Sequence, residues 1–248
     1  MHICLRNLLA ATLLALLLTG CRADTGGEAP PATLLTSRDE PGMDMVRVAA
    51  DNRRLLIGDS MAYYCTWSGV DTVGLPTRTI KQVAEGLEQA LDSGHVKRSY
   101  DEVYVFVGTA DAFFPVGWSI ETFAQRAEST SQVEISTLVN SKEKLEQFKA
   151  DFASFVRFVK ENIAYKSFVI ISPFPNPDTV NFQLIEEADQ ALSAQFGAEY
   201  VDVNDAFYDF TRGACKDPVR FRDRCHLSES GYALLRQQMD LSSPGPKR

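Results

Sequence analysis

The sequence predicts an α/β fold: a three-layer α/β/α sandwich with a mostly parallel sheet, of the flavodoxin-like kind. Two observations support this fold class. Short, continuous apolar runs that end at turn residues alternate along the chain with longer segments whose apolar residues recur at helical spacing. The continuous runs are typical of parallel strands that helices cover on both faces. Alternation of strand and helix therefore predicts one sheet with a layer of helices on each side.

The N-terminus has the features of a secretory signal, which we assign to residues 1–20. Arg6 provides a positive charge, and the apolar run that follows is much shorter than the ~20 residues that span a bilayer. The run ends in Leu-Thr-Gly-Cys, which resembles a bacterial lipobox, so Cys21 is expected to carry lipid and to begin the mature chain. An ordinary cleaved signal with a chance cysteine is the alternative.

Residues 21–45 are rich in Gly, Pro, Thr, Asp and Glu, a composition typical of a flexible tether. The rest of the chain, 46–248, is long enough for one domain with a full hydrophobic core. Lipid on Cys21 would make the membrane a partner and anchor the domain in the bacterial cell envelope. Arg22 is not the aspartate that retains similar lipoproteins at the inner membrane, so we expect the periplasmic face of the outer membrane.

The first strand of the domain is expected at residues 55–58, a short apolar run that stops at a turn. A helix is expected at 79–94, where apolar residues fall at helical spacing and Gly94 suits the C-terminus. Residues 102–108 form a second buried run and predict the next strand.

The stretch 112–140 fits no regular element. We interpret it as a lid or an insertion that shapes a substrate site, in which Trp118 and Phe123 either contact substrate or pack the loop down. Residues 141–162 then predict a long helix, because they carry one apolar stripe and Ser141 can cap the N-terminus.

The last third predicts a strand, a helix, a short strand and a closing helix, at 167–175, 181–197, 200–203 and 228–239. In sheets of this kind, ligands bind at the carboxyl ends of the strands. The formal net charge of −8 and the lack of a basic stripe argue against nucleic acid as a partner.

Three cysteines remain in the exported domain, so at most one disulfide forms within it. Cys215 and Cys225 bracket a short polar loop, and we expect them to pair. Cys65 would then be a buried free thiol, as is common for a lone cysteine beside aromatic residues. A disulfide between Cys65 and Cys225 is the alternative.

One histidine is placed for chemistry. His226 follows Asp223 by three positions, and a carboxylate that near can fix the tautomer of the imidazole. The other ring nitrogen is then free to take a proton from a hydroxyl, and Ser60, at the end of the first strand, is the best candidate. Asp59 is interpreted as an anchor for this turn through hydrogen bonds to neighbouring N–H groups. A metal site at Asp223 and His226 is disfavoured, because no further Cys/His cluster appears.

The chain resembles the SGNH (GDSL-type) hydrolases. Four motifs carry the resemblance, each at the end of an expected strand or before the last helix, and in the family's order. They are Gly-Asp-Ser at 58–60, Gly74, Gly-Thr-Ala-Asp-Ala at 108–112, and Asp-Arg-Cys-His at 223–226.

The resemblance implies a catalytic triad of Ser60 as nucleophile, His226 as general base and Asp223 as orienting acid. It also implies that the backbone amides of Ser60 and Gly74 bind the oxyanion. The family's third oxyanion donor is an asparagine side chain, and here that position is Ala110. Loss of one donor typically lowers turnover about 10²–10³-fold, so two amides would support reduced activity. A neighbour such as Thr109, or a residue from the 112–140 insertion, could supply the missing bond.

The resemblance implies a serine esterase without cofactor or metal, and the lipobox at Cys21 would anchor it in the cell envelope. It would act on short acyl esters of carbohydrate, such as O-acetyl groups, or on lipid esters. An O-acyltransferase that passes the acyl group to a glycan would use the same residues. The Ala110 departure also leaves open a degenerate, non-catalytic lipoprotein that keeps the fold as a binding module.

Overall fold

The computed structural model describes residues 34–35, 46–76, 78–113, 122, 126, 134, 138, 141–174, 182–209, 214–222 and 226–242. The predicted signal, the lipidation site Cys21, and almost all of the predicted tether and lid, with Trp118 and Phe123, lie outside the described residues. Asp223 and Cys225 lie outside them as well. Within these ranges, no helix combines the length and apolar character that crossing a bilayer requires.

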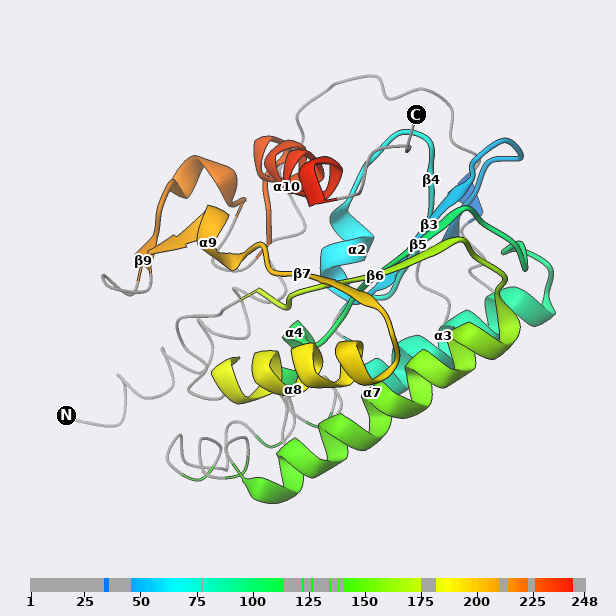
Figure 1. Cartoon of the computed structure of the whole chain (residues 1–248). Coiled ribbons are helices and arrows are strands. Elements are labelled where there is room, and N and C mark those ends of the chain that lie inside the picture. The colour runs from blue at the N-terminus through cyan, green and yellow to red at the C-terminus, as the bar shows by residue number, and fades with distance from the viewer. Residues whose placement is uncertain are drawn as a thin grey trace.

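One sheet of seven strands forms the centre of the fold, in the order β1-β2-β4-β3-β5-β6-β7 (Figure 1). The four predicted strands are confirmed as β3, β5, β6 and β7, which run parallel to one another. Their bounds are Arg54–Gly58, Glu102–Phe106, Ser167–Ile171 and Glu199–Val201. The predicted fold class, a mostly parallel sheet between helices, is confirmed.

A fifth parallel strand, β4 (Val70–Gly74), lies beside β3 and has no continuous apolar run, because it contains Asp71. The Asp71 carboxylate is buried but well bonded. It accepts hydrogen bonds from the Ala49 N–H at 2.9 Å, from the Asn52 amide at 2.8 Å and from the Tyr100 hydroxyl at 2.8 Å. Burial of a carboxylate is tolerated where such bonds replace its water.

The edge of the sheet beyond β4 is antiparallel. There β2 (Val46–Arg47) pairs with β4, and β1 (Leu34–Leu35) pairs with β2. A second, small sheet pairs β8 (Tyr208–Asp209) with β9 (Ala214–Cys215). These two-residue strands are too short to produce a recognisable pattern of apolar and polar residues in the sequence. Strand β1 lies within the segment predicted as a tether.

The four predicted helices are confirmed, and they cover both faces of the sheet (Figure 1). On one face lie α3 (Ile80–Asp92), α7 (Lys142–Asn162) and α8 (Phe182–Gln195); on the other lie the short α2 (Ser60–Tyr64) and the closing α10 (Glu229–Ser242). Each face buries its own apolar cluster. The shorter helices are α4 (Thr109–Phe113), α9 (Asn204–Phe207) and the 3₁₀ helix η1 (Pro218–Arg220).

Helix α7 shows how the sequence pattern sets the packing. The Ser141 hydroxyl accepts a hydrogen bond from the Lys144 N–H at 3.1 Å, which confirms the predicted cap. The predicted stripe is also confirmed, since Phe148, Phe152 and Phe155 are buried against the sheet. Replacement of one such phenylalanine by alanine typically costs about 3–5 kcal/mol.

The predicted disulfide between Cys215 and Cys225 is wrong, because Cys215 carries a free thiol. Cys215 lies in β9 opposite Tyr208 of β8, and its half-buried side chain packs against the apolar cluster beneath α10. Strand pairing and apolar packing thus hold this residue without a cross-link. Cys65 is buried and free, as predicted, and burial raises the pKa of its thiol to about 12. Such a thiol is protonated and unreactive at neutral pH.

Candidate active site

The carboxyl ends of three neighbouring parallel strands bring three of the sequence motifs together. Gly58, the last residue of β3, is in register with Gly74 at the end of β4 and with Phe106 at the end of β5. The Gly-Asp-Ser turn and the start of α4 therefore lie at the same edge of the sheet. This is the edge at which α/β proteins bind ligands.

Two glycines allow the close approach of backbones at this edge. A Cβ atom on Gly58 would lie 2.1 Å from the Phe106 carbonyl oxygen, and one on Gly74 would lie 2.3 Å from the Tyr63 backbone nitrogen. Both distances are too short for any side chain. Gly74 therefore has a packing role, since it lets α2 lie against β4, and this role is independent of any contact with an oxyanion.

Asp59 joins the first motif to the third. Its carboxylate accepts hydrogen bonds from the Met61 N–H at 2.9 Å and from the Ala110 N–H at 3.3 Å, and its own N–H donates to the Phe106 carbonyl at 3.3 Å. Burial raises the pKa of Asp59 to about 6, although the two N–H donors and nearby His226 oppose the rise. The interpretation of Asp59 as an anchor is confirmed.

Ser60 is the first residue of α2, directly after this anchor, and is 9% exposed. The N–H groups in the first turn of a helix have no partner within the helix, so they point toward whatever lies at its N-terminus. A serine hydroxyl at this position is nearly enclosed but still in contact with solvent.

Helix α2 is held by two side chains that sequence reasoning missed. Arg47, from edge strand β2, donates to the carbonyls of Ala62 at 3.4 Å and of Tyr63 at 3.3 Å, and also to that of Cys65. The Tyr232 hydroxyl, from α10, donates to the Met61 carbonyl at 2.7 Å. Carbonyls at a helix C-terminus need such partners. No local pattern identifies either donor, because each lies far from α2 in the sequence.

The loop that carries His226 packs onto the same helix. The Arg222 N–H donates to the His226 carbonyl at 2.9 Å, and Phe221 pairs with Leu227, so the loop closes on itself. The His226 ring contacts the ring of Tyr64 edge to face, with the centroids 4.8 Å apart. Tyr64 follows Ser60 by four residues in α2, so both side chains lie on one side of the helix.

The structure thus brings Ser60, Gly74, Ala110 and His226 to one rim of the sheet, whereas Asp223 lies outside the described residues. The hydrogen bonds of the described residues include none between the Ser60 hydroxyl and the His226 ring, which has a further interaction besides its contact with Tyr64. Catalytic hydrogen bonds often tighten only when substrate binds. Ala110 is buried, and the neighbouring Thr109 hydroxyl is buried with no hydrogen-bond partner among the described residues. The described residues hold no group of three or more potential metal ligands.

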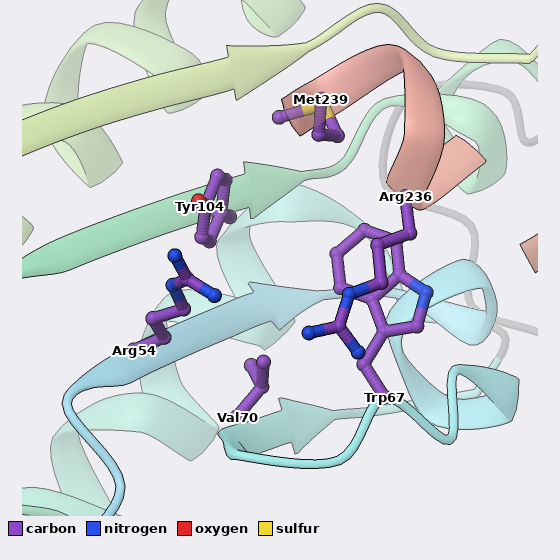
Figure 2. Close-up of a pocket in the computed structure, with 6 residues that line it drawn as sticks. All are labelled: Arg54, Trp67, Val70, Tyr104, Arg236 and Met239. Carbon is purple, nitrogen blue, oxygen red and sulfur yellow. The ribbon is translucent and has the colours of Figure 1, made fainter. Parts of the chain in front are cut away.

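A small pocket lies elsewhere, between α10 and the sheet. Its volume is about 10 Å³, room for about one water molecule. Figure 2 shows its lining, which shares no residue with the rim described above: Arg54, Trp67, Val70, Tyr104, Arg236 and Met239. Arg54 and Val70 are the first residues of β3 and β4, so the pocket lies away from the carboxyl ends of the strands.

No family model and no curated protein matches this sequence. Solved structures do match. A lipase/acylhydrolase from Enterococcus faecalis is 16% identical with a TM-score of 0.51, over 76% of this chain and 94% of that one. An acetylxylan esterase from Geobacillus stearothermophilus, crystallised as a catalytic mutant, is 16% identical with a TM-score of 0.52, over 79% and 95%. A putative acylhydrolase from Bacteroides fragilis is 13% identical with a TM-score of 0.55, over 78% and 86%.

The chain has the fold of these proteins. This agrees with the three-layer α/β/α fold with a mostly parallel sheet that the sequence predicted. At identities this low the similarity concerns the fold, and function has to be argued from the site.

Proposed function

We propose that this chain is a serine ester hydrolase that acts through an acyl-enzyme, with Ser60 as nucleophile, His226 as general base and Asp223 as the acid that orients it. One observation carries the proposal: the His226 ring packs on Tyr64, one helical turn beyond Ser60, at the carboxyl edge of the sheet. The two residues lie near opposite ends of the domain sequence. The fold shared with acylhydrolases and an acetylxylan esterase supports the same reaction class.

In the proposed reaction, the Ser60 hydroxyl attacks the ester carbonyl carbon while His226 takes its proton. The imidazolium then gives this proton to the leaving alcohol, and the acyl group stays on Ser60. Water, deprotonated by His226, attacks the acyl-enzyme. The carboxylic acid leaves as the proton returns to Ser60, so the enzyme is restored.

The oxyanion would be bound by the backbone amides of Ser60 and Gly74. Because Ala110 has no side-chain donor, we expect lower turnover than a three-donor site would give. The Thr109 hydroxyl is a candidate for the missing donor, since it is adjacent to Ala110 and is buried with no partner in the part of the chain that the structure describes.

The proposed substrates are short acyl esters of carbohydrate, with lipid esters as the second choice. The acetylxylan esterase among the structures of the same fold favours carbohydrate esters. We also propose that lipid on Cys21 anchors the enzyme at the periplasmic face of the outer membrane. A transfer reaction would use the same residues, and an acylated product from an added glycan acceptor would reveal it.

The full chain in detergent, tested with 4-nitrophenyl acetate and a fluorophosphonate probe, decides the proposal. We expect turnover, and a probe adduct that mass spectrometry places on Ser60. The Ser60→Ala variant should lose both signals, whereas Ser68→Ala, which changes an exposed serine of the same region, should keep them. The esterase proposal is wrong if the wild-type chain neither hydrolyses the ester nor reacts with the probe.

A further inference from the structure

One aromatic ring at the candidate site is shared by a base and a cation. The Arg222 guanidinium lies over the Tyr64 ring, with Cζ 4.4 Å from the centroid. The same ring contacts the His226 ring at 4.8 Å. Arg222 and the proposed general base therefore contact the same ring, which belongs to the helix that begins at Ser60.

Arg222 is a cation without a carboxylate partner in the described part of the chain. Its side chain is exposed, and the contact with Tyr64 is the interaction that holds it. Among the described residues, four other arginines each pair with an acidic side chain. These are Arg53, Arg54, Arg98 and Arg220. In a chain of net charge −8, an arginine that is fixed in place and has no carboxylate partner among the described residues is available to an anion from outside.

The backbone that carries this arginine is well anchored. Phe221, the preceding residue, packs against Phe207 at 6.1 Å and against Tyr208 at 5.5 Å, between ring centroids. The Arg222 N–H is bonded to the His226 carbonyl. The face of the guanidinium that lies on Tyr64 is used by the cation–π contact. Its in-plane N–H groups have no partner in the described ranges, and they can bind a carboxylate or phosphate in two-point fashion.

We propose that Arg222 binds an anionic group, a carboxylate or a phosphate, on the alcohol part of the ester substrate. This inference rests on the proposed esterase function. In that reaction His226 gives its proton to the leaving alcohol, so the alcohol part of the ester lies on the His226 side of the site. Arg222 and His226 come from one loop and flank one ring. The cation therefore faces the alcohol part and selects acylated acidic sugars or phosphorylated alcohols over neutral esters.

Matched acetyl esters of one shape test the proposal on the full chain. 4-Acetoxybenzoate carries a carboxylate, 4-acetoxyphenyl phosphate carries a phosphate, and 4-acetoxybenzamide is neutral. We expect kcat/KM for at least one anionic ester to exceed that for the amide by about fivefold or more, mainly through a lower KM, because the contact is remote from the reacting atoms. The excess should shrink as salt is raised.

Variants of Arg222 give the decisive comparison. Arg222→Ala should collapse the ratio of anionic to neutral turnover toward one, and Arg222→Lys should keep part of it, because a lysine retains the charge but not the planar fork. Arg98→Ala, which changes an exposed arginine at the other end of the sheet, should keep the wild-type ratio and turnover. Circular dichroism of each variant verifies the fold.

The outcomes separate the two proposals. If the wild type hydrolyses all three esters with equal efficiency, or if the preference survives in Arg222→Ala and Arg222→Lys alike, the inference about Arg222 is overturned and the esterase proposal stands. If the wild type hydrolyses none of them and takes up no fluorophosphonate, the esterase proposal fails and the inference fails with it.

Discussion

The carboxylate of Asp59 accepts a hydrogen bond from the backbone N–H of Ala110 at 3.3 Å. This bond fixes the turn before Ser60 to the start of α4, so the first and third motifs form one rigid unit. Ala110 is therefore tied by its backbone to the turn that carries Ser60. The resemblance implies that this position holds the third oxyanion donor, and an alanine side chain has no donor to offer.

Ala110→Asn should raise kcat by up to about 10²-fold, because it adds a side-chain donor to an oxyanion site that otherwise has two backbone amides. Steady-state kinetics with 4-nitrophenyl acetate measure the change. Ala110→Leu is the matched control, since leucine has a similar size and no donor. Equal kcat values for the asparagine and leucine variants would contradict the prediction. An inactive wild type that gains activity with asparagine would favour the degenerate-lipoprotein alternative.

Gly74→Ala should destabilise the protein by about 1–3 kcal/mol, because the added methyl would lie 2.3 Å from the Tyr63 backbone nitrogen and would push α2 away from β4. Urea unfolding measures the loss. Gly86→Ala is the control: its methyl would meet the flexible end of Leu75 at 2.5 Å, and alanine favours the helix. The prediction fails if Gly74→Ala unfolds at the wild-type urea concentration.

Tyr232→Phe should cost about 1–2 kcal/mol of unfolding free energy, since the buried Met61 carbonyl loses its donor at 2.7 Å. Turnover should fall as well, because this bond positions the helix that carries Ser60. Tyr165→Phe makes the same chemical change at a hydroxyl with no hydrogen-bond partner among the described residues, and should be near neutral. Equal losses in the two variants would show that the bond to Met61 contributes nothing.

The stability of the protein should depend on pH through Asp111. Burial raises the pKa of this carboxyl to about 6, although Lys144 and the Ile80 N–H oppose the rise. In the unfolded chain this carboxyl loses its proton near pH 4, whereas in the folded protein it keeps the proton until about pH 6. The free energy of unfolding is therefore highest below about pH 4 and decreases as the pH rises to about 6. The loss amounts to about 3 kcal/mol.

Asp111→Asn should therefore be least harmful above pH 6, and unfolding measured from pH 4 to 7 tests this. Asp101 should give the opposite dependence of stability on pH. Its bonds to Arg53 and Lys166 lower its pKa, so its contribution is present above about pH 4 and is lost in acid. Asp101→Asn should accordingly be most harmful near neutral pH. Parallel pH dependences for the two variants would refute this assignment.

Asp189→Leu should raise the unfolding free energy by about 1–3 kcal/mol at pH 7. Asp189 is fully buried in α8, and neither carboxylate oxygen has a hydrogen-bond partner in the described structure. Burial, with Glu186 and Asp111 nearby, raises its pKa well above the usual range. The gain should grow as pH rises from about 4, where the unfolded chain begins to release this proton.

Asp205→Leu, which changes an exposed carboxylate, should give no such gain. A destabilised Asp189→Leu protein would mean that the buried carboxyl has a stabilising partner, and the prediction would be withdrawn.

The regular elements were predictable because their signals are local. Each signal is a pattern within a few residues of sequence: the apolar runs of β3, β5, β6 and β7, and the apolar stripe of α7. A parallel strand needs an apolar run because both of its faces are buried. No apolar run predicted strand β4, because Asp71 interrupts its pattern; only the family position of Gly74 implied a strand there. Its burial depends on Asn52 and Tyr100, which are remote in the chain.

The cysteines show the limit of reasoning from spacing. Their separation suggested a disulfide between Cys215 and Cys225, yet Cys215 is held by pairing with Tyr208 and by the apolar cluster. Spacing says how far apart two thiols are along the chain, whereas a disulfide depends on where the two Cβ atoms point in space.

By itself, the sequence determined the order of strands and helices, the turn at Gly58 and Asp59, and the positions of Ser60 and His226 along the chain, because each depends on residues close together in sequence. Only the tertiary structure decided that Arg47 and Tyr232 hold the helix of Ser60, and that Tyr64 lies between His226 and Arg222. These contacts join residues from distant segments, and their energy depends on geometry that arises only when the whole sheet has formed.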